Sequence, residues 1–312
     1  MITKKTSTKT QNWFTLVFRV KGSVILAIYK RVIGFGLFAL FISALYYLQI
    51  PVSQPNLASV IPSIVLGLLL VFRTNTAYER FWEGRRLWAN LVNDARNMAW
   101  QIGVMMNDVE PEDRNKRIAA IRLILALLVS CRLRLRLEPV NSELAELMSS
   151  SQYLQLQEIN NPPLQIISWI GDYMQQQYQR GNDFLHYSHV SFLQTNMKNM
   201  MESLGHCERI LKTPLPLAYS IHLKQLLFIY CSLLPFQLVK DLGWWTSIIV
   251  SLISFTLLGI EEIGVEIENP FGYDTNDLPL NDICNEIKYD IEEFIHYNLT
   301  LTSASDKINL EG

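Results

Sequence analysis

The sequence predicts an all-α integral membrane protein with four transmembrane helices and a cytoplasmic helical domain. Hydrophobic residues make up 49% of the 312-residue chain, and they gather in four runs instead of being spread evenly. The long stretch between the second and third runs is polar and has the spacing of apolar residues that is typical of helices. That stretch has few strand signals and little Gly or Pro outside the NPP at 161–163.

The four apolar runs are the candidate membrane-spanning segments. They extend from Val32 to Leu48, from Leu57 to Phe72, from Leu226 to Val239 and from Trp244 to Ile260. Each run is somewhat shorter than the roughly 20 residues that cross a bilayer. Each helix is therefore expected to extend beyond its run or to lie within a protected bundle.

Charged residues beside the runs predict their orientation. Lys30 and Arg31 precede the first run, Arg73 and Arg80 follow the second, and the linker QIPVSQPNL between the two runs carries no charge. Because positive residues stay on the cytoplasmic side, both ends of this first hairpin should lie in the cytoplasm.

The second pair of runs is joined by a very short connection, which we place at Lys240, Asp241 and Leu242. Only a tight helical hairpin fits so few residues. Lys212 and Lys224 precede this hairpin, so its ends are also expected inside. Aromatic residues near the turns, Tyr46 and Tyr47 in the first hairpin and Trp244 and Trp245 in the second, suit the membrane interface.

These assignments divide the chain into five segments and predict a multi-pass protein of the cell membrane with both termini in the cytoplasm. The apolar stretch from Ile118 to Cys131 is interrupted by Arg122 and is too short to span, so we expect a buried soluble helix there. An amphipathic helix is expected from Leu280 to about Leu299. The segments are the N-terminal segment (1–31), the first hairpin (32–72), the cytoplasmic helical domain (73–223), the second hairpin (224–260) and the C-terminal segment (261–312).

Composition and motifs argue against several classes of function. A net charge of −2 gives no general attraction to nucleic acid. The four cysteines are far apart and form no CxxC pair, so we expect free, buried thiols and neither a disulfide framework nor a zinc site. No nucleotide-binding or hydrolase motif stands in a supporting context, which makes an enzyme the weakest interpretation, and no cofactor is expected.

The second apolar run contains a helical ridge that could line a pore. Ile64, Leu68 and Phe72 follow one another at steps of four residues and therefore share one slowly turning face of a helix. Copies of this ridge around a shared axis would form apolar rings, and a narrow apolar constriction gates by excluding water. The simpler alternative is that the ridge packs against lipid or a neighbouring helix.

Arg73 directly follows this ridge, at the expected inner mouth of such a pore. There its charge could raise the local concentration of anions. The alternative is that Arg73 only terminates the span.

Two polar clusters are weaker candidates for ion binding. His186 and His189 lie one helical turn apart, near Asp183, but two ligands and one loose carboxylate favour ordinary surface or packing roles over a metal site. Four acids follow the last run, and a solvated acidic face is favoured there over a Ca²⁺ site. These acids are Glu261, Glu262, Glu266 and Glu268.

Several stretches together resemble one family, the bestrophins, and especially their bacterial and plant-organelle branch. Their order and spacing fit across nearly the whole chain, and NPFG followed by DLPLN is the most specific part. The stretches are FRTNTAYERFWEGRRLW at 72–88, CERILKTPLPLAY at 207–219, LLPFQLVKDLGWWT at 233–246 and ENPFGYDTNDLPLNDIC at 268–284.

The resemblance implies a homopentameric ion channel with one axial pore and a hydrophobic neck, which falls by position on Ile64, Leu68 and Phe72. It also implies a cytoplasmic helical vestibule with a second constriction, which should fall near Tyr187, Ser188 and His189. Animal members carry a continuous acidic cluster after NPFG that helps to bind Ca²⁺. This chain departs from that pattern because its acids there are only Asp274, Asp277 and Asp282, so calcium regulation is not expected.

The leading hypothesis is therefore a passive, self-associating channel for small monovalent anions, with chloride as the first candidate. Since some bacterial bestrophins favour monovalent cations, a sodium or potassium channel of the same fold is the alternative. A third hypothesis is a membrane-anchored interaction module without a pore. A salt-gradient recording separates the first two, and ion-tight liposomes would indicate the third.

Overall fold

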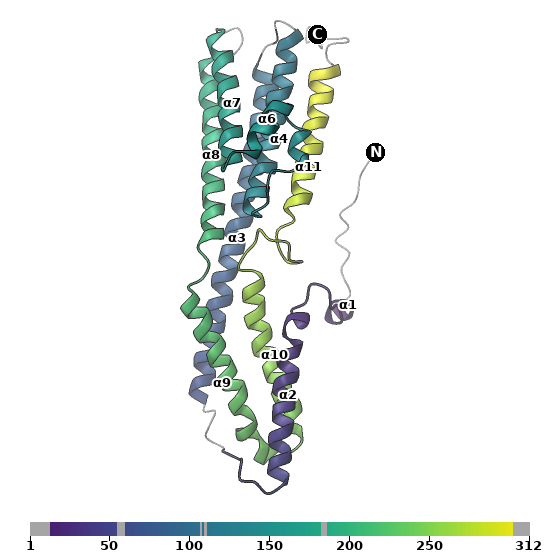
Figure 1. Cartoon of the computed structure of the whole chain (residues 1–312), viewed down its shortest axis with the longest axis vertical. Coiled ribbons are helices and arrows are strands. Elements are labelled where there is room, and N and C mark those ends of the chain that lie inside the picture. The colour runs from purple at the N-terminus through teal and green to yellow at the C-terminus, as the bar shows by residue number, and fades with distance from the viewer. Residues whose placement is uncertain (1–12, 55–59, 107, 109–110, 182–185, 302–312) are drawn as a thin grey trace, which may run out of the picture. The chain divides into compact units, whose positions relative to one another are not determined.

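The computed structural model describes residues 13–54, 60–106, 108, 111–181 and 186–301, and within these residues it contains helices and no strand (Figure 1). The all-α prediction is confirmed. In chain order the helices are α1 (Trp13–Val17), α2 (Ile25–Tyr47), α3 (Val60–Met105), α4 (Pro111–Leu135), α5 (Ser142–Ala145), α6 (Ser150–Gln157), α7 (Pro162–Gln179), α8 (Tyr187–Lys212), α9 (Leu217–Leu242), α10 (Trp245–Glu266), α11 (Leu280–Phe294) and the π-helix η1 (Ile295–Leu301).

The chain divides into two compact units. We call the first the membrane unit; it comprises Met1–Phe81, Pro214–Asn269 and Tyr273–Asp277. The second, the polar unit, comprises Trp82–Thr213, Pro270–Gly272 and Leu278–Gly312. Helix α3 contributes its first part to the membrane unit and its second part to the polar unit.

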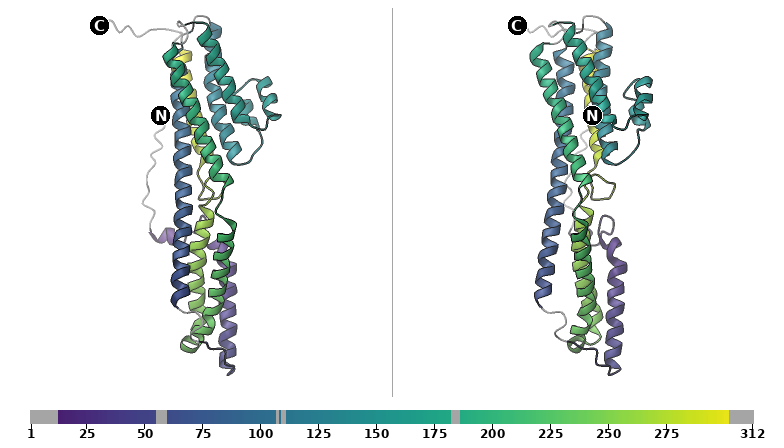
Figure 2. Two further views of the ribbon diagram at one scale, coloured as in Figure 1. Left: turned by 90° about the vertical axis from the view of Figure 1, so that its left-hand side faces the viewer. Right: turned by 60° about the vertical axis from the view of Figure 1, so that its left-hand side comes forward.

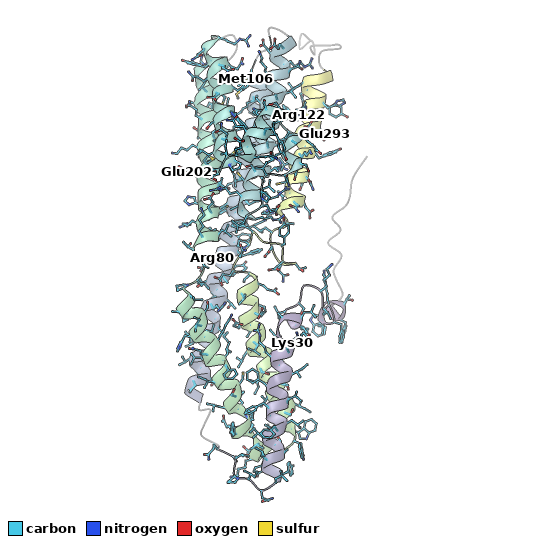
Figure 3. All side chains as sticks on the ribbon, viewed as in Figure 1. Lys30, Arg80, Met106, Arg122, Glu202 and Glu293 are labelled. Atoms are coloured by element: carbon cyan, nitrogen blue, oxygen red, sulfur yellow. The ribbon has the colours of Figure 1, made fainter. Side chains whose placement is uncertain are left out.

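In the membrane unit, α2, α9 and α10 pack against one another (Figures 1 and 2). Among the described residues, these three helices are long and apolar enough to cross a membrane. They correspond to the first, third and fourth predicted runs, and Lys30 lies near the beginning of α2 (Figure 3). The second run begins at Leu57, outside the described residues, and continues as the first part of α3.

The predicted tight hairpin between the third and fourth runs is present, but its turn lies later than expected. Helix α9 continues through Lys240, Asp241 and Leu242, so the chain reverses at Gly243 and Trp244. Gly243 has a φ of +52°, a backbone conformation that glycine adopts without strain. Trp244 then stacks on Tyr47, with the two ring centroids 4.7 Å apart. The turn moves because the helix remains intact until a residue that tolerates positive φ.

The polar unit is built on α4, which packs against α7, α8 and α11. Residues from Ile124 to Leu133 on this helix are buried, which confirms the prediction of a buried helix from Ile118 to Cys131. The alternating Arg and Leu residues at its end continue the helix to Leu135, and the chain then turns at Leu137 with a φ of +58°. Alternating Arg and Leu residues are also compatible with a strand, but here they form the end of a helix.

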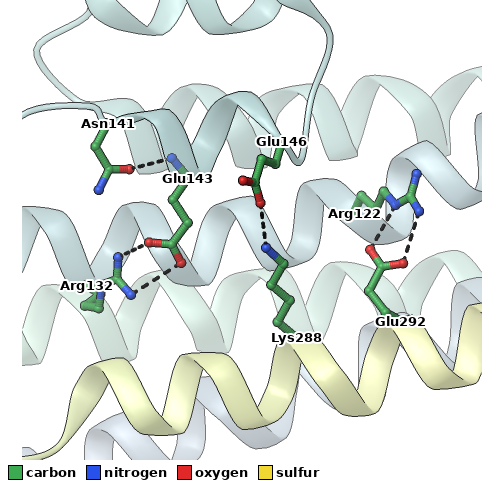
Figure 4. Close-up of polar contacts among 7 residues, drawn as sticks. All are labelled: Arg122, Arg132, Asn141, Glu143, Glu146, Lys288 and Glu292. Carbon is green, nitrogen blue, oxygen red and sulfur yellow. Dashed lines mark hydrogen bonds and ion pairs between the residues drawn. The ribbon is translucent and has the colours of Figure 1, made fainter.

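Ion pairs hold the surrounding elements to α4 (Figure 4). Both oxygens of Glu292 on α11 accept hydrogen bonds from the Arg122 guanidinium, at 2.9 and 3.0 Å. Arg132 makes a comparable forked contact to Glu143 on α5. Forked pairs of this kind fix the relative orientation of the two side chains as well as the distance between them. The predicted state of the cysteines is also confirmed, because all four are free and buried.

Candidate functional site: an apolar ridge and a buried arginine

The ridge predicted as a pore neck is solvent-accessible along α3. Ile64, Leu68 and Phe72 are 57%, 53% and 61% exposed in the single chain. With a rise of 1.5 Å per residue, the three side chains cover roughly 12 Å along the helix axis. Three large apolar side chains therefore form a continuous exposed strip on the membrane unit.

The other face of α3 is buried in the membrane unit. Leu66 and Leu70 are each 2% exposed. They belong to one apolar cluster with side chains of α2, α9 and α10, namely Ile28, Leu223, Leu227 and Leu258. The rotation of α3 is thus set by this core, and the ridge faces away from the helices of its own unit. Such a face needs lipid, water or another copy of the chain beside it.

Arg73 points into the membrane unit rather than outward with the ridge. Its side chain is 2% exposed, and its guanidinium lies 3.7 Å from a carboxylate oxygen of Glu261 and 3.8 Å from one of Glu268. Gly264 on α10 makes room for it, because a Cβ there would lie 3.3 Å from Arg73 Nε. From its sequence position, Arg73 was expected to expose its charge at the inner mouth of a pore. In the structure this charge is already paired inside the protomer.

Glu261 is the centre of a larger charged group. Its side chain is 1% exposed, and besides Arg73 it lies 3.8 Å from Arg31 and 3.9 Å from Lys224. Glu268 also accepts a hydrogen bond of 2.8 Å from the backbone N–H of Leu215. The solvated acidic face favoured from the sequence is therefore wrong for Glu261. A carboxylate so deeply buried requires cations around it, and three helices supply them.

The region predicted as a second constriction lies in the first turn of α8, in the polar unit. His186 caps this helix, since its Nδ1 accepts a hydrogen bond of 3.3 Å from the backbone N–H of Ser188. The rings of His186 and His189 are 6.0 Å apart. The Tyr187 side chain and Asp183 lie outside what the structure describes. The capping contact gives His186 a structural role and leaves the constriction a prediction.

The loop that follows NPFG uses two of its acids to hold its own shape. The backbone N–H of Asp274 donates to a carboxylate oxygen of Asp277 at 2.7 Å, and the N–H of Asp277 donates to the Asp274 carbonyl at 3.0 Å. Across the described residues, no group of three or more His, Cys, Asp or Glu side chains is close enough to hold a metal ion.

Comparison with known proteins identifies the family. The sequence profile described as Bacterial/Fungal Bestrophin protein matches residues 2–293. The chain belongs to the bestrophin family. This bestrophin is 58% identical to a voltage-dependent anion channel-forming protein of Nostoc sp., over 96% of its own length and 94% of that protein. It is 30% identical to the voltage-dependent anion channel-forming protein YneE of Escherichia coli, over 90% and 91% of the two chains.

Solved structures agree with this assignment. The crystal structure of a bacterial bestrophin homologue from Klebsiella pneumoniae aligns with a TM-score of 0.77 and 27% identity, covering 85% of this bestrophin and 97% of that chain. The family and its apolar helices make this chain a membrane protein. The names of its relatives point to a channel rather than an enzyme.

Sequence reasoning missed the partners of this bestrophin's buried arginine. One signal was available: an arginine at the end of an apolar run in a membrane helix needs a counter-charge at the same depth. Antiparallel hairpins bring the end of the second run and the end of the fourth run to the same side. Glu261, at the end of the fourth run, could have been named on that basis.

Proposed function

We propose that this bestrophin is a homopentameric channel that passes small monovalent anions such as chloride through one axial pore. Two observations support the proposal. The relatives are named as voltage-dependent anion channel-forming proteins. The exposed apolar ridge on α3 is turned away from its own helix bundle, where other copies of the chain can meet it.

The ridge supplies the neck of the proposed pore, and its exposure is the observation that carries the proposal. Five copies of Ile64, Leu68 and Phe72 around a common axis form three stacked apolar rings. An ion enters such a neck only when the neck is hydrated, so the width of the rings controls conduction. Smaller side chains at these positions should widen the neck and favour its hydration.

Arg73 has a positioning role in this proposal. It follows Phe72 on the helix and is therefore rotated by about 100° from it. By binding Glu261 and Glu268, Arg73 fixes the rotation of α3 at the inner mouth and keeps the ridge turned toward the passage. Its own charge is neutralised, so the preference for anions must come from other groups along the pathway.

The remaining features of the channel are proposed with it. The protein is a multi-pass protein of the cell membrane with both termini in the cytoplasm, and Tyr187, Ser188 and His189 contribute a second, cytoplasmic constriction. Conduction needs no calcium, because the acids after NPFG are few. Currents recorded with Ca²⁺ and with a chelator should be equal, and a current that appears only with Ca²⁺ would contradict this part.

The decisive experiment is recording from purified protein in planar bilayers under a KCl gradient. An anion channel reverses near the chloride equilibrium potential, whereas reversal near the potassium potential would identify a cation channel. Bilayers that stay ion-tight would favour an interaction module without a pore. The same recording tests the neck, since Leu68→Ala, alone or with Ile64→Ala and Phe72→Ala, should raise the conductance.

A matched control is available on another helix. Leu252 on α10 is 60% exposed, comparable to Leu68, but it does not belong to the ridge. Leu252→Ala should leave the conductance unchanged. Equal changes in conductance for Leu68→Ala and Leu252→Ala would argue against the ridge as the neck of the pore.

A further inference from the structure

The membrane unit contains a cavity that the proposed pore does not use. Its volume is about 620 Å³, within the usual range for ligand sites, and it lies between α2, α9 and α10. All of its lining residues belong to the membrane unit. They include Arg31, Phe35, Phe38, Lys224, Phe228 and Glu261.

Most of the wall is apolar and aromatic. Phe35 and Phe38 come from α2, and Phe228 comes from α9. The rings of Phe35 and Phe228 lie 5.9 Å apart, and Phe228 is 65% exposed. Gly34 keeps one side open, since no atom lies within 4 Å of the position that a Cβ would take. The cavity is therefore an open apolar groove along helices that are able to cross a membrane.

The groove has cations at one end only. Arg31 is near the beginning of α2 and Lys224 near the beginning of α9, whereas Phe38 lies two helical turns further along α2, at roughly 10 Å. The Arg31 and Lys224 side chains are 47% and 58% exposed, so both can reach a ligand. A basic end that continues into an apolar slot matches a molecule with an anionic head and a hydrocarbon chain.

Two nearby acids pair with these cations and use part of their donor capacity. Glu261 lies 3.7 Å from Arg73, 3.8 Å from Arg31 and 3.9 Å from Lys224, but its side chain is 1% exposed, so it faces the two exposed cations from the buried side only. Arg31 donates from Nη1 to Glu262 at 3.1 Å, but a guanidinium has five donors and an ammonium has three. Within the described residues, Arg31 and Lys224 thus keep donors free for an anion on the exposed side.

We propose that this groove binds one anionic phospholipid. The phosphate lies between Arg31 and Lys224, and an acyl chain lies along Phe35, Phe38 and Phe228. Membrane lipid is the amphiphile that surrounds these helices, and basic pockets between membrane helices at the cytoplasmic side bind anionic headgroups. A zwitterionic lipid is disfavoured, because its ammonium group would lie beside the two cations.

The test is native mass spectrometry of the full chain, purified in detergent and titrated with phosphatidylglycerol or phosphatidylcholine. The wild type should retain phosphatidylglycerol in preference to phosphatidylcholine. The double variant Arg31→Gln with Lys224→Gln should bind it roughly 30-fold more weakly, because each basic residue near the headgroup contributes about a factor of five. Lys240→Gln, at the opposite end of α9, is the matched control and should bind like the wild type.

A second variant tests the apolar part without touching the charges. Gly34→Leu adds a side chain to the open groove, where no neighbouring atom obstructs it, and should also weaken retention of phosphatidylglycerol while the oligomer stays intact. Equal retention of the two lipids by the wild type, or unchanged retention in both groove variants, would overturn the proposal. A disulfide that joins two chains through Gly34→Cys would also overturn it, because a second copy would then occupy the groove.

Discussion

The guanidinium of Arg73 lies 3.7 Å from the carboxylate of Glu261, and neither side chain is more than 2% exposed. The pair joins α3, which carries the apolar ridge, to α10. Burial removes both charges from water at a large cost, which their mutual attraction and the surrounding cations offset. The rotation of the ridge helix therefore depends on Glu261, a partner that is far from the ridge in the sequence.

Removing one partner of this pair should destabilise the protein strongly. Glu261→Gln leaves Arg73 as a buried charge without its nearest carboxylate, and we expect a loss of about 3–5 kcal/mol in the free energy of unfolding. The melting temperature of the purified protein in detergent measures this loss. Replacing both residues by Met should recover part of it, because the two fully buried charges are then removed together.

Glu262 provides the control for this prediction. It is adjacent to Glu261 and pairs with Arg31, which is 47% exposed, so the pair is screened by solvent. Glu262→Gln should change the stability by at most about 1 kcal/mol. Equal losses for Glu261→Gln and Glu262→Gln would argue against a special role of the buried pair.

Cysteine labelling can map which face of α3 meets water. Burial raises the pKa of Cys207 and of Cys284 to about 12, and all four native cysteines are buried and free. Because the thiolate is the reactive form, the native protein should not react with a charged thiol reagent at pH 7.5. In reconstituted channels, Leu68→Cys should react and block the current, whereas Leu70→Cys, on the buried face, should not. Labelling of both positions at the same rate would contradict the assigned rotation of α3.

Glu208 should make the stability of the polar unit depend on pH. Burial opposes ionisation of this carboxylate, but hydrogen bonds from Lys212 and Arg134 outweigh that effect and hold its pKa below the ordinary value. A lowered pKa in the folded state means that the ionised group stabilises the fold above the unfolded-state pKa, near 4.3. This contribution is lost as the pH falls through the lower, folded-state pKa.

The Glu208→Gln variant should therefore be less stable than the wild type at pH 7, by about 1–2 kcal/mol, and the difference should shrink as the medium is acidified below pH 4. Thermal unfolding across this pH range measures it. Glu202, on the outer side of α8, pairs with Lys198 at the exposed surface and is the control (Figure 3). Glu202→Gln should have almost no effect. A stability difference for Glu208→Gln that stays constant down to pH 2 would rule out the assigned ionisation.

The NPFG turn packs tightly against α3 within the polar unit. A Cβ on Gly84 would lie 2.8 Å from Cγ of Pro270 and 3.1 Å from Cζ of Phe271, which is fully buried. Gly84→Ala should therefore displace this turn and cost about 1–3 kcal/mol in thermal unfolding. Gly205 on α8 has no such neighbour, so Gly205→Ala should instead stabilise the helix by up to about 1 kcal/mol. If both variants behave alike, the close packing at Gly84 is unimportant.

Local patterns in the sequence were sufficient to predict several elements. Long apolar runs predict α2, α9 and α10, because only a helix satisfies its own backbone groups in lipid. Four-residue spacing groups Ile64, Leu68 and Phe72 on one face, since that relation depends only on helix geometry. The interrupted run around Arg122 predicts a buried helix, and α4 is buried over most of that run.

Other features depended on how the helices pack. The first part of α3 is apolar on more than one face, so periodicity could not tell the buried Leu66 and Leu70 from the exposed Leu68. The direction of Arg73 followed from the space left at Gly264 and from the carboxylate of Glu261, which α10 brings to it. The sequence by itself determined which segments are helices and which residues share a face. Only the tertiary structure decided which face is buried and which charges meet, because these depend on the rotation of several helices at once.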